Sequence, residues 1–123
     1  MAHPAVDKFG ELVITKLRDC AIEFFDLAAR GNWRAPSLQS LQTELVRQSP
    51  EQIDLIRRCL VRAVDHGMHD FLFALAEAHD LGKGIEVVID GQNVVSLSDG
   101  LHGEQFGDDG WITKFGKYPE ESN

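Results

Sequence analysis

The spacing of apolar residues changes once along the chain, at residues 81–84, and this change constrains the fold more than any other feature. Before it, apolar residues recur every three or four positions, which is the period of an amphipathic helix. After it, β-branched residues flank a short turn sequence, as they do in a β-hairpin. Gly82 and Gly84 interrupt the helical pattern between the two regions. The sequence therefore predicts an α+β fold, with the helices first and a C-terminal β-hairpin or small antiparallel sheet after them.

The helical part is expected to form about three amphipathic helices, at residues 6–30, 38–47 and 50–79. On the first of them, Arg18 and Asp19 fall on the polar side, which should face solvent. The opposite side should pack into the core, and it holds Val13, Leu17, Cys20, Ala21, Phe24 and Ala28.

The third helix has the clearest start in the chain. Ser49 is an N-cap residue, Pro50 occupies the first helical position, and Gln52 completes a capping box. Gly67 lies in the helix interior, where glycine costs about 1 kcal/mol relative to alanine. Either two helices meet at Gly67, which would break the 50–79 helix, or another backbone passes close to it. One side of this helix carries Ile53, Ile56, Leu60, Val64 and Phe71.

The predicted hairpin has strands at 85–89 and 94–97, on either side of an Asp-Gly turn sequence. Two registers are open at this point. A two-residue turn pairs Ile89 with Gln92, whereas a four-residue loop pairs Ile89 with Val94.

A third strand at 111–115 would give the hairpin the support that an isolated two-stranded ribbon lacks. The length of the chain fits a single domain over residues 1–123. The polar ends, 1–5 and 119–123, are expected to be frayed.

The composition limits the classes of partner. Acidic residues outnumber basic ones by 20 to 12, and the formal net charge is −8. Direct nucleic-acid binding is disfavoured, because it needs a surplus of Lys and Arg. The sequence has neither a signal-peptide pattern nor a run of about 18 apolar residues, so we expect a cytoplasmic protein without membrane contact. Cys20 and Cys59 lie in helical patterns, where a free cysteine usually acts as a small buried apolar residue.

His66, His69 and Asp70 are the candidate metal ligands. On a helix they are i,i+3 and i,i+4 neighbours, and imidazole and carboxylate groups can together bind a divalent transition metal. A further ligand must come from elsewhere, and His102 is the candidate. The pattern is not HExxH, so the favoured alternative is that the histidines bond backbone or carboxylate groups. No other cofactor is expected.

Residues 99–110 form a glycine-rich acidic loop without lysine or arginine. The loop could bind calcium, although it lacks the regular acidic spacing of a calcium loop. It could instead be a surface connection packed by its own apolar side chains, or it could present acidic and aromatic groups to a cationic protein partner. The candidate partner-binding residues are His102, Glu104, Phe106, Asp108, Asp109 and Trp111.

Three functions remain open, because the sequence matches none of the common catalytic motifs. The preferred function is a small acidic protein-binding or regulatory module, comparable in size and charge to an immunity protein that blocks a cationic enzyme. The second is a metal-dependent enzyme that uses the histidine cluster. The third is a self-associating structural or assembly protein, in which a homodimer and a monomer are equally expected. It is suggested by residues 60–76, which are apolar on almost all sides, and by Leu12 and Ile22, which lie outside the main apolar side.

Overall fold

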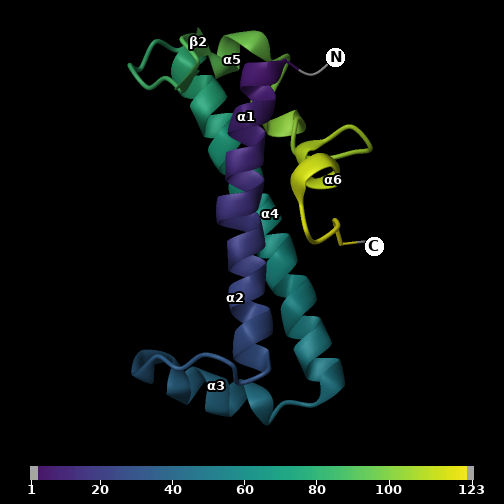
Figure 1. Cartoon of the computed structure of the whole chain (residues 1–123). Helices are drawn as coiled ribbons and strands as arrows, with labels where there is room; N and C mark the ends of the chain where they lie inside the picture. The colour runs from purple at the N-terminus through teal and green to yellow at the C-terminus, as the bar shows by residue number, and fades with distance from the viewer. Residues whose placement is uncertain (1–2, 122–123) are drawn as a thin grey trace.

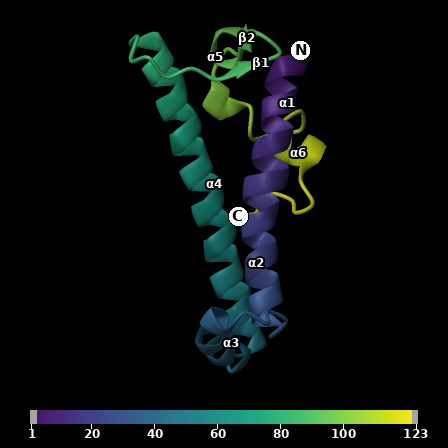
Figure 2. The ribbon, with the colours of Figure 1, turned by 60° about the vertical axis from the view of Figure 1, so that its left-hand side comes forward.

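The computed structural model describes residues 3–121 and shows a mostly helical α+β fold with a small two-stranded antiparallel sheet. Two long helical segments lie side by side and give the molecule an elongated shape (Figures 1 and 2). The sheet lies at one end of this pair, and the short helix α3 (Gln39–Val46) lies at the other. Among the described residues, no helix has both the length and the apolar composition that crossing a membrane requires.

The first long segment, the N-terminal helix, consists of α1 (Pro4–Val13), the π-helical turn η1 (Ile14–Arg18) and α2 (Asp19–Ala29), which follow one another without a break. Its start is capped by His3, whose side chain accepts a hydrogen bond from the N–H of Ala5. The π-helical turn is wider than an α-helical one, so it changes which side chains face inward after it.

The second long segment is α4 (Pro50–Asp80), which follows α3 and the 3-10 turn η2 (Pro36–Leu38). The expected capping box is formed. The hydroxyl of Ser49 accepts a hydrogen bond from the N–H of Gln52, and the side chain of Gln52 accepts one from the N–H of Ser49. The helix continues through Gly67, so the alternative of two helices meeting there is wrong.

The hairpin consists of β1 (Val88–Ile89) and β2 (Gln92–Asn93). Its register pairs Ile89 with Gln92, so the two-residue turn is the one formed. The two turn residues have φ values of 52° and 76°, and positive φ at both positions is what a turn matched to the twist of the strands requires.

The first strand is shorter than the predicted 85–89. The strand predicted at 94–97 is wrong, because this segment forms the short helix α5 (Val94–Leu97) and the second strand lies at 92–93 instead. Asn93 starts this helix, since its side-chain oxygen accepts a hydrogen bond from the N–H of Ser96 at 3.2 Å. Such a local bond favours a helix N-terminus over strand pairing. Val94 and Val95 are then buried in the core.

The third strand predicted at 111–115 is also wrong, because this segment forms the helix α6 (Trp111–Phe115). Trp111 is 1% exposed and packs beside Gly10 of α1. A Cβ at Gly10 would lie 2.3 Å from the indole, so glycine is required for this contact. Phe9 adds an edge-to-face ring contact with a centroid distance of 5.9 Å. Burial of a large aromatic side chain, rather than strand pairing, therefore holds this segment.

The most unusual core residue is Arg18, which is 0% exposed. Its Nε donates a hydrogen bond to Oδ1 of Asp65 on α4 at 2.6 Å, and its Nη2 donates to Oδ2 at 3.3 Å. The guanidinium group also donates to the backbone carbonyls of Tyr118 and Pro119. One side chain therefore joins the N-terminal helix, α4 and the residues after α6 (116–121), which we call the C-terminal segment.

The burial of Arg18 and Asp19 overturns the prediction that both face solvent. The π-helical turn explains the difference, because it rotates every later residue relative to a regular helical wheel. Leu17 and Phe24, which were expected in the core, are instead 50% and 38% exposed.

Three other side chains also differ from expectation. Cys20 and Cys59, predicted to be buried, are both exposed free cysteines. Ile22, predicted to lie outside the main apolar side, is 0% exposed within the chain, whereas Leu12 is exposed. Ile22 therefore belongs to the protein's own core.

A second ion pair joins the two long helices, near the end of the helix pair at which α3 lies. Nε of Arg57 donates to Oδ1 of Asp26 at 2.8 Å. This hydrogen bond raises the pKa of Arg57 above its ordinary value, against a smaller opposing effect of burial. Arg57 therefore stays charged across the physiological pH range.

Both ends of the described chain make contacts, although 1–5 and 119–123 were expected to be frayed. Ala5 is buried in the first turn of α1. The carboxylate of Glu120 accepts a hydrogen bond from the N–H of Gly107 at 3.2 Å. The outermost two residues at each end lie outside the residues that the structure describes.

We predict that Arg18→Met lowers the free energy of unfolding by about 3–5 kcal/mol, because Asp65 is then a buried charge without its partner. Asp65→Leu should cost a similar amount for the converse reason. The double variant should lose less than the sum of the two single losses. Urea unfolding monitored by circular dichroism measures all three, and single losses below about 1 kcal/mol would contradict a buried pair.

We also predict that Gly10→Ala lowers the free energy of unfolding by about 1–3 kcal/mol, because Trp111 must move away from α1. Gly103→Ala is the matched control, since nothing lies within 4 Å of a Cβ at that position. The same unfolding measurement, with tryptophan fluorescence as a second signal, tests the pair. Equal stability of the two variants would show that Trp111 is not held against Gly10.

Candidate functional site

The first candidate site is the histidine cluster on α4. Nε2 of His66 lies 3.3 Å from Oδ2 of Asp70, and Nδ1 of His69 lies 3.4 Å from Oδ1 of the same carboxylate. His66 and Asp70 have side chains that are 79% and 65% exposed. These are contacts between side chains on a solvated helix surface, where such pairs contribute little to stability.

The structure brings His102, the candidate external ligand, next to this cluster. Its ring stands edge-on to the ring of His69, with centroids 5.2 Å apart, and edge-on to that of Phe73 at 5.1 Å. Within residues 3–121, no group of three or more His, Cys, Asp or Glu side chains is placed to hold a metal ion. The metal site at His66, His69 and Asp70 stays a prediction.

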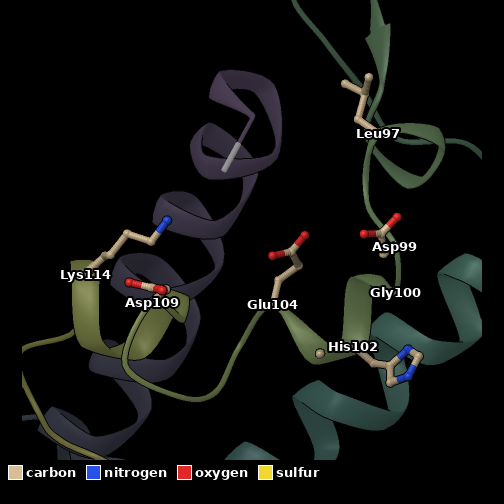
Figure 3. Close-up of a pocket in the computed structure, with 8 residues that line it drawn as sticks. Leu97, Asp99, Gly100, His102, Glu104, Asp109 and Lys114 are labelled. Carbon is tan, nitrogen blue, oxygen red and sulfur yellow. The ribbon is translucent and has the colours of Figure 1, made fainter. Parts of the chain in front are cut away.

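The second candidate site is a hollow of about 790 Å³ between the acidic loop and α6 (Figure 3). Asp99, Glu104 and Asp109 line it, together with Lys114. The amine of Lys114 lies 3.0 Å from the carboxylate of Asp7, so its charge is already paired. The hollow therefore has a surplus of negative charge, which suits a cationic group.

Hydrogen bonds to three parts of the fold hold the loop around this hollow in place. The carboxylate of Glu104 accepts a bond from the hydroxyl of Ser98 at 2.6 Å, and its backbone carbonyl accepts one from the N–H of Trp111 at 2.8 Å. Gln105 is fully buried and donates to the backbone carbonyl of Asp65 on α4 at 2.9 Å. The acidic side chains thus stand on a loop anchored to α4 and α6.

The predicted partner-binding residues do not all reach this hollow. Glu104 and Asp109 line it, and His102 forms part of its wall while its ring points toward α4 (Figure 3). Asp108 is exposed outside the lining. Trp111 is buried and has no surface to offer a partner, which corrects that prediction.

Phe106 is 38% exposed and lies beside His69, with ring centroids 6.2 Å apart.

The sequence did not predict every residue that lines the hollow. Asp99 is the first residue of the acidic loop, so the composition of the loop could have identified it as part of the site. Nothing in the sequence indicated Lys114, because only the tertiary structure brings α6 next to the loop. The lining residues not predicted are Leu97, Asp99, Gly100, Gly103 and Lys114.

The third candidate site is an apolar side of α4. Phe71 is 59% exposed and Ile56 is 38% exposed on this side. Gly67 lies between them, and apart from the adjacent residues and turns of its own helix, no atom of residues 3–121 comes within 4 Å of a Cβ placed there, so no other backbone passes close to it. Spacings of three and four residues put a set of positions on one helix side, and these hold Ile53, Ile56, Leu60, Ala63, Gly67, Phe71 and Ala74.

A matching apolar side occurs on the N-terminal helix. The C-terminal segment covers its other side, where the backbone N–H of Lys117 donates to Asp19 at 3.1 Å and the amine of Lys117 lies 3.3 Å from Glu23. Leu17 and Ala21 lie nearly opposite these acidic residues on the helical wheel. They therefore point away from the C-terminal segment.

The C-terminal segment contacts the N-terminal helix through Arg18 and Asp19, and each long helix exposes apolar side chains away from it. In Figure 1 this segment lies on the right of the helix pair, and Figure 2, turned so that the left-hand side of Figure 1 comes forward, still shows α6 beside α1. We call these exposed apolar sides together the uncovered face. Its residues are Leu17, Ala21 and Phe24 on the N-terminal helix, where Phe24 also contacts the ring of Trp33, and Ile53, Ile56, Leu60, Gly67, Phe71 and Ala74 on α4. Ala63 is left out, because it lines a hollow together with Glu120 and Glu121 of the C-terminal segment.

Comparisons of the chain with protein-family models, with curated proteins and with solved structures found no match. A proposal of function therefore rests on these three surfaces.

Proposed function

We propose that this protein is a protein-binding module and that the uncovered face is its main binding surface. The observation that carries the proposal is the exposure of large apolar side chains on two adjacent helices, between 38% and 59% for Leu17, Phe24, Ile56 and Phe71. Monomeric proteins rarely expose contiguous apolar patches larger than a few hundred Å².

The chemistry of the face supports binding to protein. None of its residues is charged, and the centres of protein–protein interfaces are depleted in charge. Two neighbouring helices also present ridges and grooves into which further helices can pack, as in helix bundles. A helical partner surface is therefore the best complement to this face.

The cytoplasm is the proposed location. Cys20 and Cys59 are exposed free thiols. Exposed thiols of this kind persist in a reducing compartment, whereas oxidising compartments favour disulfides.

Affinity capture from cells of the source organism tests the main proposal. Wild type should retain a partner protein, or untagged copies of this chain, and Phe71→Glu should lose it because a charge then enters an apolar contact. Leu55→Glu is the matched control, because Leu55 is 57% exposed on the same helix but outside the uncovered face. Retention that is equal for both variants would rule out the uncovered face as the binding surface.

The acidic hollow supports a second candidate function, recognition of a basic side chain on a partner. Asp99, Glu104 and Asp109 approach it from separate turns of an anchored loop. Negative charge at such a site speeds encounter with a cationic protein. This interpretation agrees with the formal net charge of −8.

A titration with a capped tri-lysine peptide, followed by NMR, tests this second function. At low salt we expect shifts of the backbone amides of residues 99–109, which should weaken in high salt because added ions screen the charges. The double variant D99N/D109N should abolish these shifts, while Asp54→Asn, on the surface of α4, should leave them unchanged. Shifts that persist in the double variant would exclude the hollow.

A further inference from the structure

We propose that residues 30–35, which we call the Trp33 turn, bind a short acidic segment of a partner protein and that Arg34 holds one carboxylate of that segment. The turn connects α2 to α3, at the end of the helix pair opposite to the sheet (Figure 1). None of its residues belongs to the uncovered face, so the site is additional to the function proposed above.

The distribution of charge along the chain distinguishes this region. Residues 27–50 hold a single acid, Glu44, whereas the rest of the chain holds 19 acids and nine basic residues. The same region holds three arginines, at positions 30, 34 and 47. Its formal charge is therefore positive, while that of the remainder is strongly negative. A local charge of this kind directs an oppositely charged partner to one place on the surface.

Arg34 is exposed and has no partner among the described residues. Within 3–121, no ion pair or side-chain hydrogen bond involves its guanidinium group or those of Arg30 and Arg47. Arg30 and Arg47 are the C-cap residues of α2 and α3, where the helix dipole favours a positive charge. Arg34 lies between the two helices and has no such role, so its charge is available to a ligand.

The acids that flank this region in the sequence have other roles. Asp26 is paired with Arg57. Glu51 lies in the first turn of α4, where the helix dipole favours a negative charge. The positive charge of the region is therefore not cancelled by ion pairs with its neighbours in the sequence.

A hollow of about 550 Å³ lies at the Trp33 turn. Arg34 is the only charged residue that lines it, and the fork of one guanidinium group matches the geometry and the single charge of one carboxylate. The side chain of Asn32 makes no hydrogen bond within residues 3–121 and adds an amide donor. The lining residues are Gly31, Asn32, Trp33, Arg34 and Gln39.

Two further positive charges lie near the hollow. Arg30 directly precedes Gly31, which lines it. A Cβ at Gly31 would lie 3.6 Å from Cγ1 of Val46, the residue before Arg47. A segment with several carboxylates therefore finds a positive charge on either side of Arg34.

Two glutamines of α3 hold the turn in one conformation. Gln42 is 4% exposed, and its Oε1 accepts a hydrogen bond from the N–H of Trp33 at 2.6 Å while its Nε2 donates to the carbonyl of Trp33 at 2.9 Å. Gln39 donates to the same carbonyl at 2.9 Å. The indole N–H of Trp33 donates to the carbonyl of Phe24 at 3.0 Å. A turn fixed in this way loses little conformational freedom when a ligand binds.

A short acidic segment of a protein fits this site better than a nucleic acid does. Nucleic-acid interfaces commonly neutralise about six to ten phosphates, whereas this region offers three guanidinium groups. A long polyanion would also meet the negative charge of the remaining surface. Tryptophan and arginine, in contrast, are the residues that protein–protein interfaces enrich.

A titration of the isotope-labelled protein with a capped tri-glutamate peptide, followed by NMR, tests the proposal. We expect shifts of the backbone amides of residues 30–35 and of the indole N–H of Trp33. The chain has two tryptophans, and Trp111 is the internal reference, because it is 1% exposed and its indole signal should not move. The absence of shifts at residues 30–35 would overturn the proposal.

Variants of Arg34 locate the contact. Arg34→Gln should weaken binding of the peptide at least about tenfold, because a charge-assisted hydrogen bond is lost. Arg34→Lys should lie between this variant and wild type, since lysine keeps the charge but not the fork. Lys83→Gln is the matched control, because it is exposed at the other end of the helix pair and changes the net charge equally. Equal affinities of wild type and Arg34→Gln would overturn the proposal.

Inorganic phosphate is the second probe. At equal concentration it should shift the amides of the Trp33 turn less than the peptide does, because a single anion cannot also reach the charges of Arg30 and Arg47. Larger shifts with phosphate than with the peptide would overturn the proposed acidic segment and would identify the turn as a site for a free oxyanion.

Discussion

The buried pair of Arg18 and Asp65 is the interaction on which the rest of the structure depends. It crosses from the N-terminal helix to α4, and the same guanidinium group binds the backbone carbonyls of Tyr118 and Pro119. A buried charge without its partner is strongly unfavourable. We therefore expect the N-terminal helix and α4 to pack cooperatively. The pair therefore fixes the position of the two helices relative to each other along their axes, because Arg18 must lie beside Asp65. It also decides which side of them the C-terminal segment covers.

Covering one side of a two-helix pair leaves the other side to solvent. The π-helical turn before Asp19 directs Arg18 and Asp19 toward the C-terminal segment. Leu17 and Phe24 are turned outward as a result. On α4, Phe71 and the open position at Gly67 face the same way. One electrostatic contact and one irregular helical turn together account for the apolar side chains on which the proposed function rests.

The acidic hollow and the uncovered face lie on different parts of the molecule and differ in chemistry. The hollow presents carboxylates on a loop anchored by Glu104 and Gln105. The face presents uncharged side chains on two regular helices.

The sequence by itself determined the elements that local chemistry decides. These are the capping box at Ser49, the long helix after it, and the Asp-Gly hairpin turn, because each depends on bonds between near neighbours in the chain. It also identified both long helices as amphipathic, but the π-helical turn changes the buried side of the first, so that Arg18 and Ile22 are buried where Leu17 and Phe24 were expected. Only the tertiary structure decided which of these sides becomes core, because burial depends on contacts between residues distant in sequence. Arg18 with Asp65, and Trp111 with Gly10, are such contacts, and no periodic pattern encodes them.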